Sequence, residues 1–345
     1  MNGLAADTSP VGGLVSIVIV NWNGGEMLMK CLRSVAEQSY RPVEVILVDN
    51  ASIDGSIQNA AKEYPDIRIV QSPINVGFAG GNNLGVGAAR GDYVALLNND
   101  TVVDRLWLEQ LKHMIDTTGA AVVTSKVITE GVPDEWYEMN GSLNYLGYNI
   151  MRVFADLSHV YFAGGASLIF RRETVGLPFL SEYFLYHEDV YLSWRMRLMG
   201  YDVRMAQESV VRHRGSASTA KQPSALTTFY QERNRILNCF IFYEPWTLLR
   251  LLPYFAGDAV VKTVLSLLGR GKSFRGIVRA YAWLAGNARW ILRLRREIQS
   301  RRTVRDSTLL SLMSCNVLAS GSGVAPFVNV LSRWYSFLVR LPHHV

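Results

Sequence analysis

The segment LVSIVIVNWNGGEMLMKCLRSVAEQSYRPVEVILVDN, residues 14–50, decides the fold. Residues 14–20 and 43–49 are almost continuous apolar runs of strand length, which are typical of strands buried on both faces of a parallel sheet. The segment between these runs repeats apolar side chains at helical spacing, at Met27, Cys31, Leu32 and Val35. A strand, a helix and a second strand in this order indicate the first unit of a parallel sheet.

The same alternation continues along the first part of the chain. Apolar runs predict further strands at 67–70, 92–98 and 120–127, and helices are expected near 55–64, 80–90 and 104–116. The predicted fold class is therefore α/β, with a doubly wound and mostly parallel sheet.

The next part of the chain is less regular. Residues 130–160 are rich in Gly, Asn and Tyr and predict a long loop or a short antiparallel insertion, whereas residues 161–172 predict a strand entered through paired glycines. A helix is expected from Glu188 to Met199, ending at Gly200, with a strand after it.

The composition is that of a globular protein. Of the 345 residues, 49% are apolar and 19% charged, which excludes an intrinsically disordered or fibrous chain. The length suits two domains, or one large domain with an appendage. The widely spaced cysteines predict neither a disulfide framework nor a zinc site. The first residues lack the pattern of a secretory signal, so we expect the bulk of the protein in the cytoplasm.

The charge is divided unevenly between two parts of the chain. Residues 1–239 hold 20 Lys and Arg against 25 Asp and Glu, a net −5, and residues 240–345 hold 15 against 4, a net +11. Such asymmetry indicates contact with a polyanion, which is either nucleic acid or an anionic membrane surface. Tryptophans and leucines are interleaved with the basic residues, and no groove-reading motif is present, so the membrane is favoured over nucleic acid.

One segment of this basic region separates its side chains by face. In residues 286–298, Ile291, Leu294 and Ile298 fall on one side of a helix, and Arg289, Arg293 and Arg296 fall on the other. The pattern predicts a helix lying in a lipid interface, and the alternative is an ordinary surface helix with solvated arginines. The uncharged run 307–332 is long enough to cross a bilayer, but its polar residues and glycines argue against spanning.

Polar side chains follow every predicted strand, where ligands bind in parallel α/β sheets. They are Asn21, Trp22 and Asn23 after the first strand, Asp49 and Asn50 after the second, residues 72–75 after the third, and Asn98, Asn99 and Asp100 after the fourth. Asp49 suits a base or ribose, or else only a turn, and Asp100 suits a divalent cation, or else only a helix cap. The glycine-rich segment 75–93, with Gly80 near a helix start, lets backbone amides approach a ligand but matches no nucleotide-binding fingerprint.

Two further candidates lie later in the chain. Glu188 and Asp189 are adjacent acids at a helix start, after an aromatic segment that would partly desolvate them and suit one of them to general-base chemistry. The alternative is that they only complement the helix dipole. His213 follows a strand and is either a metal ligand or a plain surface histidine.

Six segments in chain order decide between these alternatives. They are SIVIVNWNGG (16–25), VILVDNASIDGS (45–56), NVGFAGGNNLG (75–85), YVALLNNDT (93–101), the paired acids with LSWRMRLMGY (192–201), and VVRHRGS (210–216). Together they resemble the family 2 glycosyltransferases of GT-A fold, and most closely a rhamnosyltransferase-like bacterial branch. The resemblance covers about residues 14–240.

The resemblance implies roles for individual residues. Donor binding would involve the Trp22 region, Asp49, Asn75, Gly80 and the asparagines before Asp100. Asp100 would be the metal-binding carboxylate of a DXD-type motif, with His213 as a further ligand of Mn²⁺ or Mg²⁺. Asp189, beside Glu188, would be the catalytic base, and Gly164, Gly165 and Tyr191 would lie beside the acceptor.

The implied activity is inverting transfer of a sugar from a nucleotide-diphosphate donor, such as dTDP-rhamnose or a UDP-sugar, to a lipid-linked or polysaccharide acceptor. The basic and aromatic region 240–345 leads us to expect peripheral attachment at the cytoplasmic membrane face. The parts expected are a flexible N-terminus (1–13), a donor-binding half (14–128), an acceptor and catalytic half (129–239), and a helical basic membrane-associating region (240–345).

Two departures from the family pattern keep a second hypothesis open. Asn98 and Asn99 stand where relatives often carry an acid or a proline, and Tyr191 stands where many carry an acid. The alternative is a nucleotide-sugar or glycan-binding module with impaired catalysis. A nucleotidyltransferase is disfavoured because no basic glycine loop follows the first strand. The sequence leaves the oligomeric state open.

Overall fold

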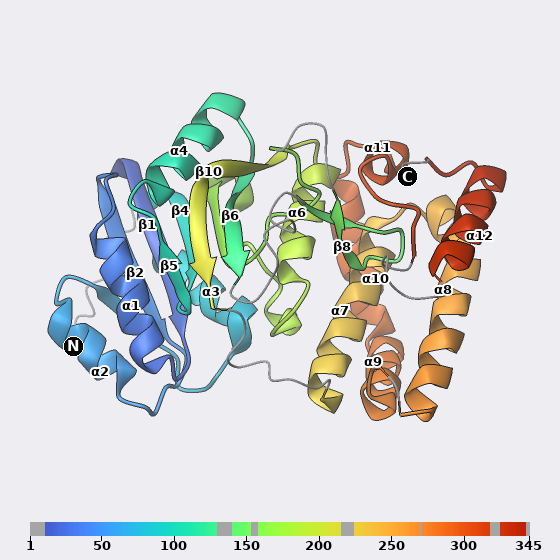
Figure 1. Ribbon diagram of the computed structural model, residues 1–345, viewed down its shortest axis with the longest axis horizontal. Helices are drawn as coiled ribbons and strands as arrows, with labels where there is room; N and C mark the ends of the chain where they lie inside the picture. The colour runs from blue at the N-terminus through green and yellow to red at the C-terminus, as the bar shows by residue number, and fades with distance from the viewer. Residues whose placement is uncertain are drawn as a thin grey trace.

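The computed structural model describes residues 11–129, 140–152, 158–214, 224–269, 271–317 and 325–342. An α/β part with one large sheet is followed by a helical part, and the two pack side by side (Figure 1). Predicted features that fall on residues 1–10, 130–139, 153–157, 215–223, 270, 318–324 and 343–345 lie outside the described residues.

The large sheet is mixed and has eight strands in the order β3-β2-β1-β4-β9-β6-β10-β5. Strands β1 to β4 are mutually parallel where they pair, β9 runs antiparallel between β4 and β6, and β10 pairs in parallel with β6 and antiparallel with β5. The predicted α/β, mostly parallel sheet is confirmed. The strands are β1 Val11–Asn21, β2 Val43–Asp49, β3 Arg68–Gln71, β4 Gly91–Asn98, β5 Thr101–Val103, β6 Val122–Thr129, β9 Ser167–Arg171 and β10 Val203–His213.

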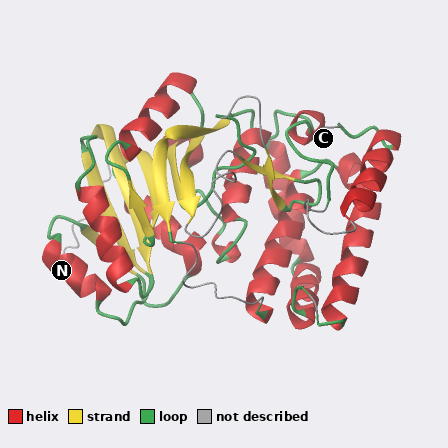
Figure 2. Cartoon of the chain, in the orientation of Figure 1, coloured by secondary structure: helices red, strands yellow, loops and turns green. Residues whose placement is uncertain are grey.

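Helices cover both faces of this sheet (Figure 2). Alternate residues of β1 serve the two faces, because Val15, Ile17 and Ile19 join one core and Val18 joins the other. The first core includes α1, α2 and α4, and the second includes α3 and α6. The helices are α1 Gly25–Ala36, α2 Ser56–Glu63, α3 Gly77–Ala88, α4 Trp107–Thr118, α5 Arg172–Val175, the 3₁₀ turn η2 Ser181–Tyr183, and α6 Glu188–Leu198.

The expected insertion between β6 and β9 contains a short antiparallel pair. Strands β7 (Asn140–Leu143) and β8 (Asn149–Arg152) form a two-stranded sheet. The distant Ser314 adds to this element, since its amide donates to the Leu143 carbonyl at 2.9 Å and its carbonyl accepts from the Tyr145 amide at 3.3 Å. The C-terminal region is thereby tied to the middle of the chain.

The helical part that follows the sheet shares a core with it. The core on the α3 and α6 side extends through α7 to Ile291, Ile298, Leu309 and Met313. The boundary expected at residue 240 falls inside α7. The helices of this part are α7 Ala225–Phe242, α8 Pro245–Leu267, α9 Phe274–Gly286, α10 Ala288–Ser300, α11 Asp306–Leu310 and α12 Ala325–Leu338.

The helix expected to lie in a lipid interface uses its apolar side internally. In α10, Ile291 and Ile298 are buried and Leu294 is half-buried against the core that includes α7. Its arginines Arg289, Arg293 and Arg296 are solvated, so the alternative of an ordinary surface helix applies to α10. Among the residues that the structure describes, no helix has the length and apolar character needed to span a membrane.

Helix α3 shows why its glycines are needed. A Cβ atom at Gly85 would lie 2.3 Å from Cγ1 of Val18, and one at Gly81 would lie 2.6 Å from Cγ1 of Val20. These glycines therefore let α3 pack closely on β1. At the exposed Gly87 of the same helix, an added Cβ would meet nothing within 4 Å.

This difference predicts opposite effects of the same substitution. Gly85→Ala should lower the free energy of unfolding by about 1–3 kcal/mol, because the helix must move away from the sheet. The matched control Gly87→Ala should raise it by about 0.5–1 kcal/mol, because alanine restricts the unfolded chain at a helical position. Urea denaturation measures both, and equal effects would contradict the assigned packing.

Candidate functional site

A cavity of about 330 Å³ lies at the carboxyl ends of β1 and β4. It receives residues from both strands, from the start of α3, from the loop before α6 and from the end of β10. The lining residues are Val20, Trp22, Asn50, Asn75, Gly77, Phe78, Asn98, Asn99, Asp100, Phe184, Leu185, Tyr186 and His213. The sequence predicted six of them, Trp22, Asn75, Asn98, Asn99, Asp100 and His213, as site residues.

Strand pairing brings Asp100 and His213 together across 113 positions of the chain. The antiparallel register of β10 and β5 sets His213 opposite Thr101, and the Arg214 amide donates to the Asp100 carbonyl at 3.2 Å. Nε2 of His213 lies 3.1 Å from Oδ1 of Asp100. A carboxylate and an imidazole therefore face the same cavity as a pair.

The two asparagines before Asp100 differ in the hydrogen bonds of their side chains. Oδ1 of Asn98 is buried at the cavity and has no hydrogen-bond partner among the described residues. The Asn99 amide donates to Oδ1 of Asn21 at 2.8 Å. An unpaired buried carbonyl oxygen is costly, so a ligand that supplies a donor or a cation there would be favoured.

Asn21 itself is buried behind the cavity, where its side chain is fully hydrogen-bonded to neighbouring residues. Its amide donates to the hydroxyls of Ser52 and Ser56 at 3.0 and 2.9 Å, while its oxygen accepts from Asn99. The structure therefore gives Asn21 no free polar atom for a donor, although it fixes Asn99, which lines the cavity. The hydrogen bonds of Asn21 join the ends of β1 and β4 to the turn after β2.

The residues expected to hold a base surround the turn after β2. Trp22 is half exposed at the cavity, and Asn23 accepts from the Ile53 amide at 2.8 Å. Oδ1 of Asp49 accepts from the Ser52 amide at 2.8 Å and so shapes the turn, while Asp49 does not line the cavity. Their roles in donor binding stay predictions.

Asn50 lines the cavity, although its position at a strand end led to no predicted binding role. Its amide donates to Oδ1 of Asn75 at 3.0 Å and to the Gly77 carbonyl at 3.1 Å, and its oxygen accepts from the Val76 amide. This set joins the end of β2 to the start of α3. Its place beside Asp49 at a strand end was the available signal. By contrast, Gly80 is buried, and a Cβ there would meet Val76 at 2.9 Å.

The loop before α6 forms another wall and has an unusual backbone. Phe184, Tyr186 and His187 have φ values of 61°, 71° and 64°, in the region that non-glycine residues rarely adopt. The loop also approaches α3 so closely that a Cβ at Gly77 would lie 2.3 Å from the Phe184 carbonyl oxygen. Such a conformation persists only when surrounding contacts impose it.

Two asparagines one turn apart on α7 supply those contacts. The Asn234 amide donates to the carbonyls of Tyr183, Leu185 and Tyr186 at 3.1, 3.0 and 2.7 Å. Asn238 donates to the His187 carbonyl at 3.2 Å and accepts from the Tyr183 hydroxyl at 2.6 Å. Sequence patterns gave no sign of this role, because it depends on packing of α7 against the loop.

The paired acids stand directly after this loop. Oδ2 of Asp189 accepts from the Gly165 amide at 3.1 Å, and a Cβ at Gly165 would touch both Asp189 and the cavity residue Phe78. Asp189 does not itself line the described cavity but adjoins it through these residues. Burial raises the pKa of Asp189, opposed by hydrogen bonds from the Val190 and Gly165 amides.

Glu188 is the more deeply buried of the two acids, and its Oε2 has no hydrogen-bond partner among the described residues. Burial, aided by the neighbouring Asp189 charge, raises the pKa of Glu188 to about 8. Glu188 therefore keeps its proton near neutral pH.

The residues expected beside the acceptor are not alike. Gly164 has open space at its Cβ position, and Gly165 contacts Asp189. Tyr191 is only 4% exposed and packs between Tyr183 and Phe242, with ring centroids 5.5 Å from each. Tyr191 therefore offers no open surface to an acceptor in this structure.

The donor set suits a divalent cation that a phosphate ligand helps to hold. Within the described ranges, no three His, Cys, Asp or Glu side chains gather as a metal-binding group. Asp100 and His213 form a two-ligand pair, and the unpaired Asn98 oxygen lies at the same cavity. Mg²⁺ and Mn²⁺ commonly use one or two protein ligands together with substrate phosphates, so these residues fit such an ion.

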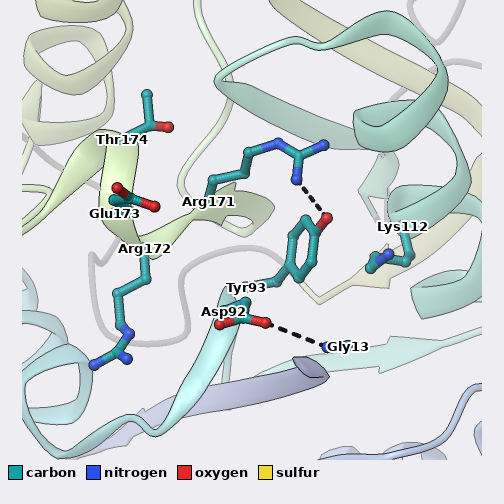
Figure 3. A pocket seen from close by; sticks show the side chains of 8 residues that line it. All are labelled: Gly13, Asp92, Tyr93, Lys112, Arg171, Arg172, Glu173 and Thr174. Carbon is teal, nitrogen blue, oxygen red and sulfur yellow. Dashed lines mark hydrogen bonds between the residues drawn. The ribbon is translucent and has the colours of Figure 1, made fainter. Parts of the chain in front are cut away.

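A larger cavity, of about 870 Å³, lies at the opposite end of β4 (Figure 3). Several of its polar side chains bond to Asp116, which does not itself line the cavity. The Tyr93 hydroxyl donates to Asp116 at 2.7 Å and accepts from Arg171, and Lys112 also pairs with Asp116. We assign no function to this cavity.

The mixed sheet, and the cavity at its carboxyl end with an acid and histidine pair, agree with the GT-A fold that the sequence resemblance implies. Residues 16–176 match the family Glycosyl transferase family 2.

Named relatives and a solved structure agree with this family match. Glycosyltransferase GlyG of Streptococcus pneumoniae is 30% identical over 32% of this chain and 38% of its own length. The N-acetylglucosaminyl-diphospho-decaprenol L-rhamnosyltransferase of Mycobacterium tuberculosis is 25% identical over 61% of this chain and 80% of its own. The structure of GalNAc-T7 with UDP, GalNAc and Mn²⁺ superposes with a TM-score of 0.58 at 16% identity, covering 79% of this chain and 57% of that one.

The shared length is limited. The match spans less than two fifths of GlyG, so the family relationship concerns the α/β part and not whole proteins. The solved structure supports the fold alone.

The buried Glu188 predicts a distinct pH dependence of stability. Its pKa is raised from 4.5 to about 8, so the folded chain keeps a proton that the unfolded chain has lost between these values. Its stabilising contribution is therefore fully present below about pH 4.5 and is lost as the pH rises through about 8.

Glu188→Gln is neutral at every pH and should remove this loss. Relative to the wild type, its free energy of unfolding should rise between pH 5 and 8 with a slope of up to about 1.4 kcal/mol per pH unit. Chemical denaturation across this range measures it. A parallel pH dependence in the two proteins would show that Glu188 titrates normally.

Proposed function

We propose that this chain is an inverting, metal-dependent glycosyltransferase that uses a nucleotide-diphosphate sugar. The observation that carries the proposal is the convergence of the Asp100 and His213 pair with the loop that leads directly into Asp189. The sugar of a donor held in the cavity would lie between these groups. The diphosphate would then lie beside the Asp100 and His213 pair, and the sugar would lie beside Asp189.

In this proposal Asp189 is the general base. Its carboxylate takes the proton of the acceptor hydroxyl as the oxygen attacks the anomeric carbon, and the bond from that carbon to the diphosphate breaks on the opposite side. The raised pKa of Asp189 suits this role, because a more basic carboxylate accepts a proton more readily. In-line displacement inverts the anomeric centre.

Asp100 and His213 would hold a divalent cation, which supplies positive charge to the leaving diphosphate when bound. The unpaired Asn98 oxygen and the Asn50–Asn75 pair would complete the polar lining around the donor. The Mn²⁺ and UDP in the GalNAc-T7 structure support this reading of the donor.

The acceptor proposed is a lipid-linked or polysaccharide intermediate at the cytoplasmic membrane face, with dTDP-rhamnose or a UDP-sugar as the donor. The mycobacterial relative is named for the transfer of rhamnose to N-acetylglucosaminyl-diphospho-decaprenol, which supports a lipid-linked acceptor. The basic region 240–345 supports the location.

Replacing the proposed base should separate catalysis from binding. Asp189→Asn should lower transfer by at least about 10³-fold, because the amide cannot accept the proton, while donor affinity changes less than about threefold. Release of nucleoside diphosphate measures turnover, and calorimetry measures donor binding. The exposed Asp66, changed to Asn, is the matched control. Normal turnover by Asp189→Asn would remove Asp189 from the mechanism.

Replacing the proposed metal ligand should act only when metal is present. Mn²⁺ should tighten UDP binding to the wild type by about tenfold or more, and Asp100→Ala should abolish that gain while leaving binding in EDTA unchanged. The exposed Asp104, changed to Ala, is the control four positions away. A metal-dependent gain that survives Asp100→Ala would contradict the assignment.

The departures at Asn98, Asn99 and Tyr191 favour a second candidate, a binding module with impaired catalysis. A donor that binds with Mn²⁺ but is never hydrolysed or transferred would support this candidate. Slow donor hydrolysis without an acceptor would support the enzyme.

A further inference from the structure

Helix α8 has its polar and apolar sides reversed relative to an ordinary surface helix. Every exposed residue of α8 is apolar. These residues include Trp246, Leu249, Leu252, Val260 and Val264. The exposed side chains recur every three to four residues along the helix, so they form one continuous stripe.

Of the three charged residues of α8, Asp258 and Lys262 face the protein, whereas Arg250 is half-buried with its guanidinium group over the ring of the exposed Trp246. Asp258 pairs with Arg235 of α7 at 2.9 Å, and Lys262 pairs with the buried Glu232 of α7. A helix that pairs its charged side chains with the protein and exposes its apolar side chains to water has an unfavourable free energy of solvation. The outer side of α8 is therefore suited to an apolar neighbour.

Helix α12 repeats the same reversal. Asn329, Ser332 and Ser336 are buried, and the Asn329 oxygen accepts from the Val317 amide at 3.0 Å. On the opposite side, Phe327 and Phe337 are each 70% exposed and Trp334 is 64% exposed.

The two reversed helices lie side by side at one edge of the molecule (Figure 1). The Tyr254 hydroxyl donates to the Ser332 carbonyl at 2.7 Å, and the Tyr335 hydroxyl donates to the Arg250 carbonyl at 2.9 Å. Their apolar stripes thus belong to one surface, the α8–α12 face, which we define by Trp246, Val260, Val264, Phe327, Trp334 and Phe337.

The charge around this face distinguishes between possible neighbours. Residues 240–345 carry a net +11, and exposed arginines Arg275, Arg279 and Arg340 belong to the same helical part. A second copy would bring two such positive regions together, with few acids to compensate them. An anionic bilayer offers hydrocarbon to the apolar stripes and negative headgroups to the arginines.

We propose that the α8–α12 face docks on the surface of an anionic lipid bilayer, with Trp246, Trp334 and Phe337 inserted at the headgroup boundary. The inference deepens the proposed function, on which it rests for a lipid-linked acceptor, by naming the surface that holds the protein at the membrane. It also replaces α10, whose apolar side is buried, as the membrane-facing element.

Vesicle co-sedimentation of the full chain tests this docking. Phosphatidylcholine vesicles containing 30% phosphatidylglycerol, about the acidic content that attracts basic proteins, should bind the chain at least about tenfold more tightly than phosphatidylcholine alone. Val260→Ser/Val264→Ser and Trp334→Ser/Phe337→Ser should each weaken binding by about tenfold or more, because less apolar area is buried in the interface.

The controls separate this face from other exposed surfaces. Leu106→Ser/Leu177→Ser removes exposed leucines from the α/β part and should leave vesicle binding unchanged. Arg293→Gln/Arg296→Gln on α10 should have a smaller effect than either face variant. Lipids brominated near the headgroup should quench tryptophan fluorescence less in Trp246→Phe and Trp334→Phe than in the wild type.

Three results would overturn the proposal. They are unchanged vesicle binding by both face variants, loss of binding only in the α10 variant, and a wild-type dimer that the face variants convert to monomer without any vesicle binding. UDP binding with Mn²⁺, measured on the same variants, keeps the two proposals apart. Variants that lose vesicles but retain UDP show a docking defect, whereas a wild type that binds vesicles but never turns over a donor contradicts only the enzyme.

Discussion

The candidate site depends on the antiparallel register between β10 and the short strand β5. That register sets His213 opposite Thr101 and so brings its imidazole to within 3.1 Å of Asp100. A shift of one residue in β10 would turn its His213 side chain to the other face of the sheet, away from Asp100. The backbone hydrogen bond from Arg214 to Asp100 extends the same register to the cavity itself.

The second constraint is the hold of α7 on the loop before α6. Three residues of this loop have left-handed backbone conformations, and Asn234 and Asn238 bond to the carbonyls on both sides of them. The loop therefore stores strain that the helical part offsets, and it places Asp189 at the helix start behind it. The helical part is thus a component of the site, because α7 carries the asparagines and shares a core with α6.

The helical part also explains why charge alone misled the choice of a membrane-facing helix. Helix α10 has the most evident separation of arginines and isoleucines in the sequence, but its isoleucines pack inside the protein. Helix α8 carries three charged residues, of which Asp258 and Lys262 pair with α7, and its exposed residues are all apolar. Amphipathic spacing shows that a helix has two sides but not which side meets the protein.

The local patterns determined much of this protein. Continuous apolar runs predicted the parallel strands, glycine and acid positions located α6, and strand-end polar residues predicted Trp22, Asn75 and Asp100 at one edge, because parallel strands end together. The family resemblance assigned His213 and Asp189 to the same site. The catalytic role of Asp189 stays a prediction.

Only the tertiary structure decided which of these residues face the cavity. Asn50 and the loop residues Phe184 and Tyr186 line it, whereas Asn21, Gly80 and Tyr191 are buried behind or beside it. Spacing along the chain fixes which side of a strand or helix a residue occupies. What that side contacts depends on segments more than a hundred positions away, and no local pattern carries that information.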